Sequence, residues 1–220
     1  MSASPKAVPH LRGLYAITPE RSDTERLVRE VTAALEGGAA LVQYRAKEAD
    51  AALALEQARR LLDRCREFGV PFIVNDRLEL ALAIGADGVH LGREDGDVRA
   101  ARAALHGRIL GVSCYDDPLL ARAAARDGAD YVGIGSVFAS STKPGAVRAG
   151  LEKLARARRE AAIPVAAIGG ITAANAAEAI ANGADMVAVV AAIFEARDIR
   201  AAARSLAQLF PVLQEASPHA

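Results

Sequence analysis

The most regular feature of the chain is an alternation of short apolar runs with longer amphipathic stretches. Most of the short runs are apolar at consecutive positions, which is typical of parallel strands that are covered on both faces. The pattern predicts eight strands: Gly13–Ile17, Leu41–Tyr44, Phe72–Val74, Gly88–Leu91, Ile109–Val112, Tyr131–Ile134, Val165–Ile168 and Met186–Val190.

The stretches between these strands have the spacing of helices. In Ala52–Phe68 and Leu119–Asp127, apolar residues recur every three or four positions and arginines occupy the opposite face. Eight strand–helix units in 220 residues predict an α/β protein with one (β/α)8 TIM barrel domain over residues 1–220. An open doubly wound sheet is the structural alternative. We expect flexible tails at about 1–10 and 212–220.

A short repeat precedes three of the predicted strands. Gly-Ala-Asp occurs at 85–87, 128–130 and 183–185, and Gly38-Ala39 is a variant of it. A glycine there can adopt the left-handed conformation that ends a helix, and the aspartate then opens the next strand. Because the chemistry of such barrels lies at the other end of the strands, we predict that these aspartates are structural and bind no metal.

Charge and cysteine content narrow the range of functions. Lysine plus arginine and aspartate plus glutamate number 27 each, so nothing attracts nucleic acid or an anionic membrane over long range. Any bound anion must be held by a local cluster. The two cysteines, Cys65 and Cys114, are too few for a disulfide framework, and we predict buried free thiols. With no apolar leader and no run long enough to span a bilayer, the sequence predicts a cytoplasmic protein.

Two cations follow the second predicted strand, in the segment Gln43-Tyr44-Arg45-Ala46-Lys47. Arginine offers a planar fork to phosphate oxygens, and lysine offers a mobile point charge. Both can face the mouth of the barrel if the chain leaves the sheet there. The alternative is a solvated surface pair.

Carboxylates follow the third and fourth predicted strands. Asp76 belongs to Asn75-Asp76-Arg77, and Asp95 ends the segment that begins at His90. Oxygen ligands from adjacent loops suit Mg²⁺, which completes its shell with substrate phosphate, and the lack of histidine partners argues against zinc. Asp76 could instead cap a helix that begins near Leu78. We expect His90 to be a core or supporting residue, and a catalytic base is the alternative.

Hydroxyl groups follow the fifth and sixth predicted strands. Ser113 lies at the rim without the Gly-x-Ser-x-Gly turn of a serine nucleophile, so a hydrogen bond to phosphate is its expected role. The loop after the sixth strand contains Ser140, Ser141, Thr142 and Lys143. It is either a phosphate-binding lid or a flexible surface loop.

The last two strands end in small residues. Gly169-Gly170 follows the seventh strand, and Val190-Ala191 follows the eighth. Glycines let backbone N–H groups approach an anion, and a helix beginning after the eighth strand would add its dipole. This is the recurrent phosphate site of such barrels. Purely structural glycine turns are the alternative.

Taken together, these segments resemble the thiamine-phosphate synthase family, and the resemblance runs from about Gly13 to Phe194. Their order and spacing are more specific than any one motif. The segments are Gln43-Tyr44-Arg45-Ala46-Lys47, Val74-Asn75-Asp76-Arg77, His90-Leu91-Gly92-Arg93-Glu94-Asp95, Ser140-Ser141-Thr142-Lys143 and Ala167-Ile168-Gly169-Gly170-Ile171.

The resemblance implies a transferase that couples 4-amino-2-methyl-5-hydroxymethylpyrimidine diphosphate with 4-methyl-5-hydroxyethylthiazole phosphate, giving thiamine phosphate and pyrophosphate. It implies that Mg²⁺ is bound by Asp76 and Asp95. The residues implied for the pyrimidine diphosphate are Gln43, Tyr44, Arg45, Ala46, Lys47, Asn75, Ser113 and Lys143, of which Arg45, Lys47, Ser113 and Lys143 would be catalytic. Those implied for the thiazole phosphate are Ser140, Ser141, Thr142, Gly170, Val190 and Ala191.

The sequence departs from the family pattern at two positions. Many members have threonine where Ser140 stands and serine where Ala191 stands. The first change keeps a hydroxyl, and the second leaves only a backbone N–H contact.

Two rival functions remain open at this point. A thiazole tautomerase on the same barrel would need an acid–base residue near the thiazole phosphate and no magnesium site, and a non-catalytic barrel would only bind a phosphorylated ligand. Asp76, Asp95 and Lys143 favour the synthase. We expect small phosphorylated partners, no nucleic acid and no membrane, and the sequence leaves open whether the chain forms a homo-oligomer.

Overall fold

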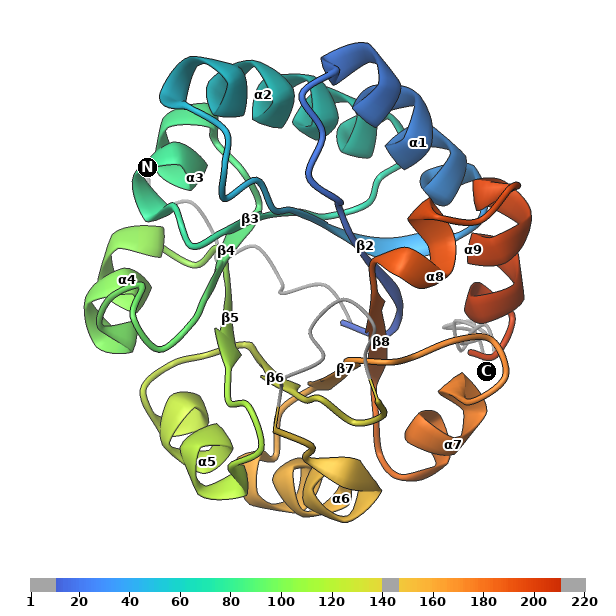
Figure 1. The fold of residues 1–220 in the computed structure, drawn as a ribbon. Helices are drawn as coiled ribbons and strands as arrows, with labels where there is room; N and C mark the ends of the chain where they lie inside the picture. Colours follow the sequence, from blue (N-terminus) through green and yellow to red (C-terminus); the bar gives the residue numbers. More distant parts are fainter. Residues whose placement is uncertain (1–10, 140–146, 211–220) are drawn as a thin grey trace, which may run out of the picture.

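The computed structural model describes residues 11–139 and 147–210, which form a closed barrel of eight parallel strands in sequence order. Figure 1 looks along the barrel, with the strands in an inner ring and the helices around them. The strands are β1 (Gly13–Ile17), β2 (Ala39–Tyr44), β3 (Phe72–Asn75), β4 (Gly88–Leu91), β5 (Ile109–Ser113), β6 (Tyr131–Ile134), β7 (Val165–Ile168) and β8 (Met186–Val189). The helices are α1 (Thr24–Glu36), α2 (Ala51–Glu67), α3 (Leu78–Ile84), α4 (Val98–Leu105), α5 (Pro118–Arg126), α6 (Gly150–Ala161), α7 (Ala176–Ala181), α8 (Ala191–Phe194) and α9 (Ile199–Ala207). The prediction of a (β/α)8 barrel is confirmed, and the open sheet is excluded.

Element boundaries differ from the predicted ones by one or two residues, and helix capping explains part of the difference. α2 begins one residue early because the Asp50 side chain accepts a hydrogen bond from Leu53 N–H. α5 begins at Pro118 because Asp117 caps it and proline suits the first helical position. β8 ends at Val189, since Val190 already leads into α8.

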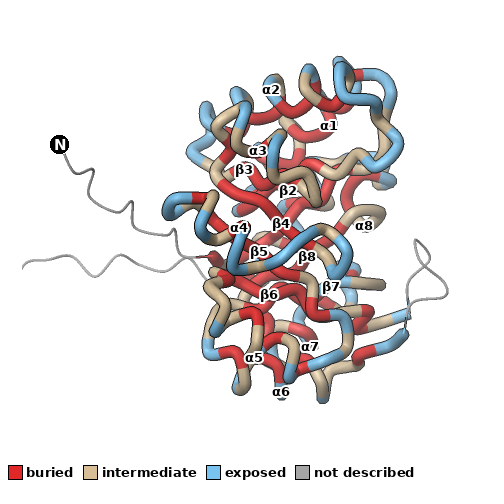
Figure 2. Tube along the Cα trace, turned by 90° about the vertical axis from the view of Figure 1, so that its left-hand side faces the viewer, coloured by how far each residue is buried: buried red, intermediate tan, exposed pale blue. Residues whose placement is uncertain are grey.

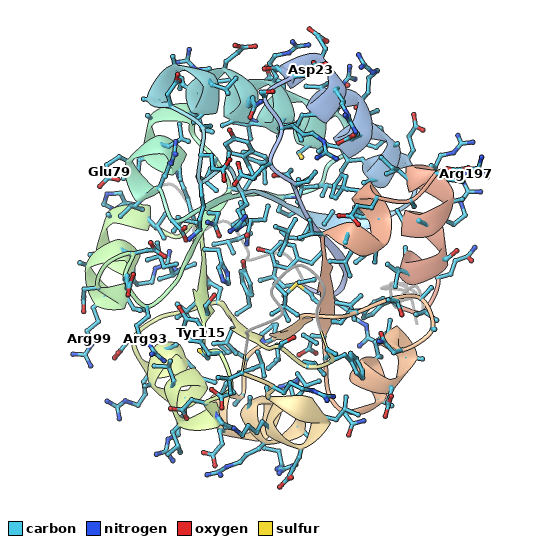
Figure 3. All side chains as sticks on the ribbon, in the orientation of Figure 1. Asp23, Glu79, Arg93, Arg99, Tyr115 and Arg197 are labelled. Atoms are coloured by element: carbon cyan, nitrogen blue, oxygen red, sulfur yellow. The ribbon has the colours of Figure 1, made fainter. Side chains whose placement is uncertain are left out.

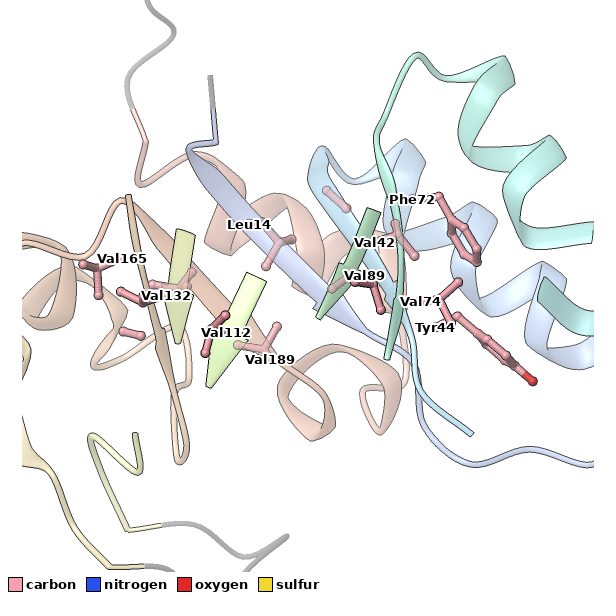
Figure 4. Close-up of a cluster of buried hydrophobic side chains, with 14 of the residues drawn as sticks. Leu14, Val42, Tyr44, Phe72, Val74, Val89, Val112, Val132, Val165 and Val189 are labelled. Carbon is pink, nitrogen blue, oxygen red and sulfur yellow. The ribbon is translucent and has the colours of Figure 1, made fainter. Parts of the chain in front are cut away.

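The apolar core has two layers, because successive strand residues point to opposite faces. Tyr15, Ile73 and Tyr131 fill the barrel interior. The other layer lies between the strands and the helices, where Leu14, Val89 and other outward-facing side chains pack (Figure 4). In Figure 2 the strands are largely buried, and most exposed residues lie on the helices and loops; Ala40 in β2 and Ile168 at the end of β7 are exposed strand residues. Most residues on both faces of the strands are therefore covered, as the apolar runs predict.

The Gly-Ala-Asp repeat has the structural role predicted for it. Gly85, Gly128 and Gly183 all have positive φ, at 70°, 101° and 98°. Each aspartate that follows accepts a hydrogen bond from the first backbone N–H of a neighbouring strand or from the one after it. The bonds run from Phe72 N to Asp87 Oδ2 (3.0 Å), from Leu110 N to Asp130 Oδ2 (2.7 Å) and from Val165 N to Asp185 Oδ2 (2.9 Å).

Cys65 and Cys114 are free and buried, as predicted. Burial raises the pKa of each thiol to about 12, so both are protonated at neutral pH. Within residues 11–139 and 147–210, no helix has the length and apolar character needed to cross a membrane.

Candidate active site

The end of β2 is held in place by the loop that follows β1. Thr18 Oγ1 accepts a hydrogen bond from Arg45 N at 2.9 Å. Glu20 Oε1 accepts one from Lys47 N at 2.7 Å and lies 3.6 Å from Arg45 Nη1. The predicted cation pair is therefore anchored through its backbone, while the two charged side chains remain partly exposed. The side chains also pair with acids, Arg45 with Glu20 and Lys47 with Asp76, which disfavours the alternative of a freely solvated surface pair.

A cavity of about 220 Å³ opens between the segments that follow β2 and β3. It combines cationic, anionic and amide groups with an apolar wall. The residues that line it are Tyr44, Ala46, Lys47, Val74, Asn75, Asp76 and Arg77. Four of them (Tyr44, Ala46, Lys47 and Asn75) are predicted to bind the pyrimidine diphosphate, so the fold brings these predicted contacts after β2 and β3 together.

Tyr44 faces away from the barrel axis, toward the helix layer. Its hydroxyl donates a hydrogen bond to Gln57 Oε1 at 2.8 Å, and its ring stacks on Phe72. Figure 4 shows the same direction, with the Tyr44 hydroxyl pointing away from the strands. Its neighbour Gln43 points inward and is 3% exposed. Within this segment, Tyr44 therefore supplies only the cavity wall.

Asp76 has an unusual backbone conformation. Its φ is 62°, a left-handed value that aspartate adopts more readily than most residues. Its Oδ2 lies 3.0 Å from Lys47 Nζ. The capping residue of α3 is Arg77, which makes no side-chain capping hydrogen bond. The interpretation of Asp76 as a helix cap is therefore wrong, because its carboxylate faces the lysine after β2.

The carboxyl group of Asp95 lies near that of Asp76. The pKa of Asp95 is raised, chiefly by burial and next by the Asp76 carboxyl group. Asp95 Oδ2 also accepts a hydrogen bond from Gly92 N at 2.8 Å. Among the residues that the structure describes, Lys47 is the cation placed beside the two carboxyl groups.

The chemistry of this donor set fits Mg²⁺. Both side chains offer carboxylate oxygens from adjacent loops, as a hard cation prefers, and their mutual repulsion favours a bound cation. In the part of the chain that the structure describes, no group of three or more histidine, cysteine, aspartate or glutamate side chains is placed to hold a metal ion. Mg²⁺ suits so small a set because it keeps several waters and takes substrate phosphate as a ligand.

Ser113 ends β5 and hydrogen-bonds to a buried histidine. Its Oγ lies 2.8 Å from His90 Nε2, and His90 Nδ1 lies 2.9 Å from the hydroxyl of Tyr131. Burial lowers the pKa of His90 to about 4, so the ring is neutral at physiological pH. Both ring nitrogens are already engaged, so His90 supports Ser113 and has no free nitrogen for a substrate.

The ends of β7 and β8 lie side by side, with Ile168 paired to Ala188. This pairing brings Gly170 close to the Val190–Ala191 segment, as the second phosphate site requires. Gly170 has φ of 66°, and a Cβ there would overlap the Ala139 carbonyl. The positive φ and the close packing therefore explain this glycine on structural grounds, whether or not it binds phosphate. α8 has only four residues, so its dipole is weaker than the sequence suggests.

The four residues predicted after β6 (Ser140, Ser141, Thr142 and Lys143) lie outside the described residues.

Several residues at the site carry no assignment from the sequence. Glu20 holds the end of β2 in place. In the sequence, its only distinguishing feature is that it is an acidic residue in the loop after β1. Arg93 stacks on the ring of Tyr115 at 4.7 Å, so the loops after β4 and β5 are in contact beside α4 and α5 (Figure 3). Tyr15 and Tyr131 place hydroxyls inside the barrel, 2.6 Å apart. In the sequence, the only indication of this is that both tyrosines occupy inward-facing positions of predicted strands.

Comparisons with known proteins agree with this geometry. The family model for thiamine monophosphate synthase matches residues 14–193. The chain is 60% identical over 201 residues to the thiamine-phosphate synthase of Aromatoleum aromaticum, covering 91% of this chain and 97% of that one. It is 57% identical to the thiamine-phosphate synthase of Thiobacillus denitrificans, with 90% and 94% covered.

Solved structures give the same result. The thiamine phosphate pyrophosphorylase of Pyrococcus furiosus is 40% identical and superposes with a TM-score of 0.83, covering 91% of this chain and 96% of that one. A 3-hexulose-6-phosphate synthase, at 19% identity and a TM-score of 0.69, shares the fold alone. The chain therefore belongs to the thiamine monophosphate synthase family.

Proposed function

We propose that this enzyme couples 4-amino-2-methyl-5-hydroxymethylpyrimidine diphosphate with 4-methyl-5-hydroxyethylthiazole phosphate, forming thiamine phosphate and releasing pyrophosphate. The observation that carries the proposal is the Asp76–Asp95 carboxyl pair beside Lys47 at the mouth of a barrel of this family. A tautomerase has no need of such a pair, whereas a diphosphate leaving group requires a cation and positive side chains.

We assign the diphosphate to the side of the mouth formed by β2 to β5. Arg45 offers a planar guanidinium to the phosphate oxygens, and Lys47 offers a point charge beside the carboxyl pair. Ser113 contributes a hydroxyl at the end of β5. Asp76 and Asp95 would hold Mg²⁺, which when bound supplies positive charge to the leaving diphosphate. Lys143 remains a predicted fourth contact.

The pyrimidine half lies against the end of β2 in this proposal. Gln43 is nearly buried and points into the barrel, while Asn75 ends β3 at the cavity. Both are uncharged, which suits an aminopyrimidine ring. Tyr44 and Ala46 contribute the cavity wall.

The chemistry needs charge stabilisation more than proton transfer. An electron-rich aminopyrimidine can stabilise a methylene cation, so the carbon–oxygen bond to diphosphate breaks and its electron pair leaves with pyrophosphate. The thiazole nitrogen then forms the new carbon–nitrogen bond, and it carries no proton to be removed. A neutral His90 with both nitrogens engaged is consistent with a site that has no general base.

We assign the thiazole phosphate to the ends of β7 and β8. Gly170, Val190 and Ala191 are half-buried there and offer backbone N–H groups. Ala191 has no hydroxyl, so its contribution is limited to the backbone. Ser140, Ser141 and Thr142 stay predicted contacts for the same phosphate.

The cellular compartment and the class of binding partner also belong to this proposal. We infer action in the cytoplasm, supported by two unpaired thiols. The balanced charge supports small-molecule substrates without nucleic acid.

The decisive assay supplies both phosphorylated halves with Mg²⁺ and measures pyrophosphate release together with thiamine phosphate. We expect stoichiometric formation of both products, and no product when either half is omitted. Tautomerisation of a carboxythiazole phosphate without pyrophosphate release would overturn the proposal.

A further inference from the structure

A continuous chain of hydrogen bonds crosses the barrel interior from β2 to β5. Gln43 Nε2 lies 2.5 Å from Tyr15 Oη, and Tyr15 Oη lies 2.6 Å from Tyr131 Oη. Tyr131 Oη lies 2.9 Å from His90 Nδ1, and His90 Nε2 lies 2.8 Å from Ser113 Oγ. The two phenols are 1% and 0% exposed. We call these four residues before Ser113 the relay.

The first bond sets the direction of all the others. An amide nitrogen can only donate, so Tyr15 Oη accepts from Gln43. Among the described residues, the only other hydrogen-bond neighbour of Tyr15 Oη is the Tyr131 hydroxyl. The single proton of Tyr15 must therefore go to Tyr131, because leaving it buried without a partner costs about 1–3 kcal/mol.

The direction then passes to the histidine. Tyr131 Oη accepts from Tyr15, so its own proton is donated to His90 Nδ1. A neutral imidazole that accepts at Nδ1 carries its proton on Nε2. His90 Nε2 therefore donates to Ser113 Oγ. The serine oxygen is an acceptor in this bond, and its own proton is free for another partner.

We propose that the relay is a positioning device: its one-way hydrogen bonding holds His90 as the Nε2–H tautomer and so makes Ser113 a hydrogen-bond donor toward the barrel mouth. Ser113 is only partly buried, and it ends a strand on the side assigned to the diphosphate. A donor there suits an anionic oxygen, whereas with the opposite tautomer the serine proton would point at His90. The link to the diphosphate rests on the proposed function, but the tautomer does not.

The backbone of β5 makes room for this arrangement. A Cβ on Gly111 would overlap the Tyr131 ring and would lie 2.5 Å from His90 Nδ1. Gly111 has no requirement for positive φ, so space for the Tyr131–His90 hydrogen bond is the reason that a side chain is excluded.

Nuclear magnetic resonance of the full-length protein with ¹⁵N-labelled histidine tests the proposal without any ligand. The His90 signals are identified by their loss in His90→Gln. We expect one neutral tautomer with the proton on Nε2 and an unprotonated Nδ1. A proton on Nδ1 would overturn the proposal, whatever reaction the enzyme catalyses.

Two phenol-to-phenylalanine variants form a matched pair, because each removes one buried hydroxyl from the relay. In Tyr15→Phe, Tyr131 keeps its proton for His90, so the Nε2–H tautomer should persist. In Tyr131→Phe, Nδ1 loses its donor, and signals of both tautomers should appear. Equal tautomer behaviour in the two variants would contradict the assigned direction.

Binding of inorganic pyrophosphate with Mg²⁺ measures the consequence at Ser113. Tyr131→Phe should weaken this affinity about tenfold, the effect of losing one hydrogen bond to a charged group. In a Ser113→Ala background, the same substitution should have almost no further effect. An equal loss in both backgrounds, or no loss in either, would count against the relay.

Discussion

Aspartates at the two ends of the barrel have opposite surroundings. At the amino ends of the strands, Asp130 accepts a backbone hydrogen bond from Leu110 and pairs with Arg102 at 2.8 Å. At the carboxyl ends, Asp76 and Asp95 lie close to each other, with Lys47 as the cation beside them. Among the described residues, an aspartate pairs with an arginine at one end, whereas two aspartates share one lysine at the other.

From this difference we propose that Asp130 is a structural carboxylate and that Asp76 and Asp95 are functional ones. A carboxylate that accepts backbone N–H groups and pairs with arginine holds two strands together. Two carboxylates that repel each other persist only where something else uses their charge. We therefore expect substitutions at the two ends to affect different properties of the enzyme.

The largest expected effect is on turnover, in Asp76→Ala. Loss of a metal ligand should lower turnover by about a hundredfold or more, since metal stabilisation of transition-state charge contributes several kcal/mol. The Mg²⁺ concentration for half-maximal rate should rise. Steady-state kinetics over a Mg²⁺ titration measures both, and Asp130→Ala is the matched control. An unchanged Mg²⁺ titration in Asp76→Ala would break the comparison.

The next effect is on stability, in Asp130→Ala. The substitution leaves the Leu110 N–H and the Arg102 guanidinium without their partner, so the free energy of unfolding should fall by about 1–3 kcal/mol. Urea denaturation measures the loss. Asp130→Asn keeps an acceptor oxygen and should recover part of it. An equal loss of unfolding free energy in Asp76→Ala would contradict the proposed difference between the two ends of the barrel.

The smallest expected effect concerns the pH dependence of the metal-free enzyme. The pKa of Asp95 is raised in the folded protein, so its ionisation opposes folding. This cost is absent below the ordinary aspartate pKa and grows as the pH rises through the raised one. Metal-free Asp95→Asn should therefore melt a few degrees above the unchanged enzyme at neutral pH, roughly the response to a small stability gain.

Thermal melts across the pH range check this prediction. The advantage of Asp95→Asn should disappear in acid, and added Mg²⁺ with pyrophosphate should stabilise only the unchanged enzyme. A variant that melts lower than the unchanged enzyme at neutral pH would contradict the raised pKa.

Much of the fold could be predicted because it depends on local patterns. Runs such as Tyr131–Ile134 consist of consecutive residues that suit burial, which is typical of strands covered on both faces. The predicted first residue of a helix differs from the observed one where an aspartate such as Asp50 caps the first turn. The candidate site could be predicted in part, because the position of Arg45, Asp76 or Asp95 after a strand places it at the mouth.

What the sequence could not predict depends on contacts between distant segments. Tyr15 and Tyr131 are 116 residues apart, and only the barrel register brings their hydroxyls together. The pairing of Asp76 with Lys47 depends on a left-handed backbone at Asp76 that its helix-start pattern does not indicate. Tyr44 points to the helix layer because of its place in the strand alternation, which a linear motif does not show.

Titration with Mn²⁺, a spectroscopic substitute for Mg²⁺, tests most directly whether the carboxyl pair at the mouth is a cation site. Electron paramagnetic resonance would follow free Mn²⁺ in the presence of pyrophosphate for the unchanged enzyme, Asp76→Ala and Asp130→Ala. We predict one bound ion per chain in the unchanged enzyme and in Asp130→Ala, with binding lost in Asp76→Ala. Equal Mn²⁺ binding by all three proteins would contradict the account.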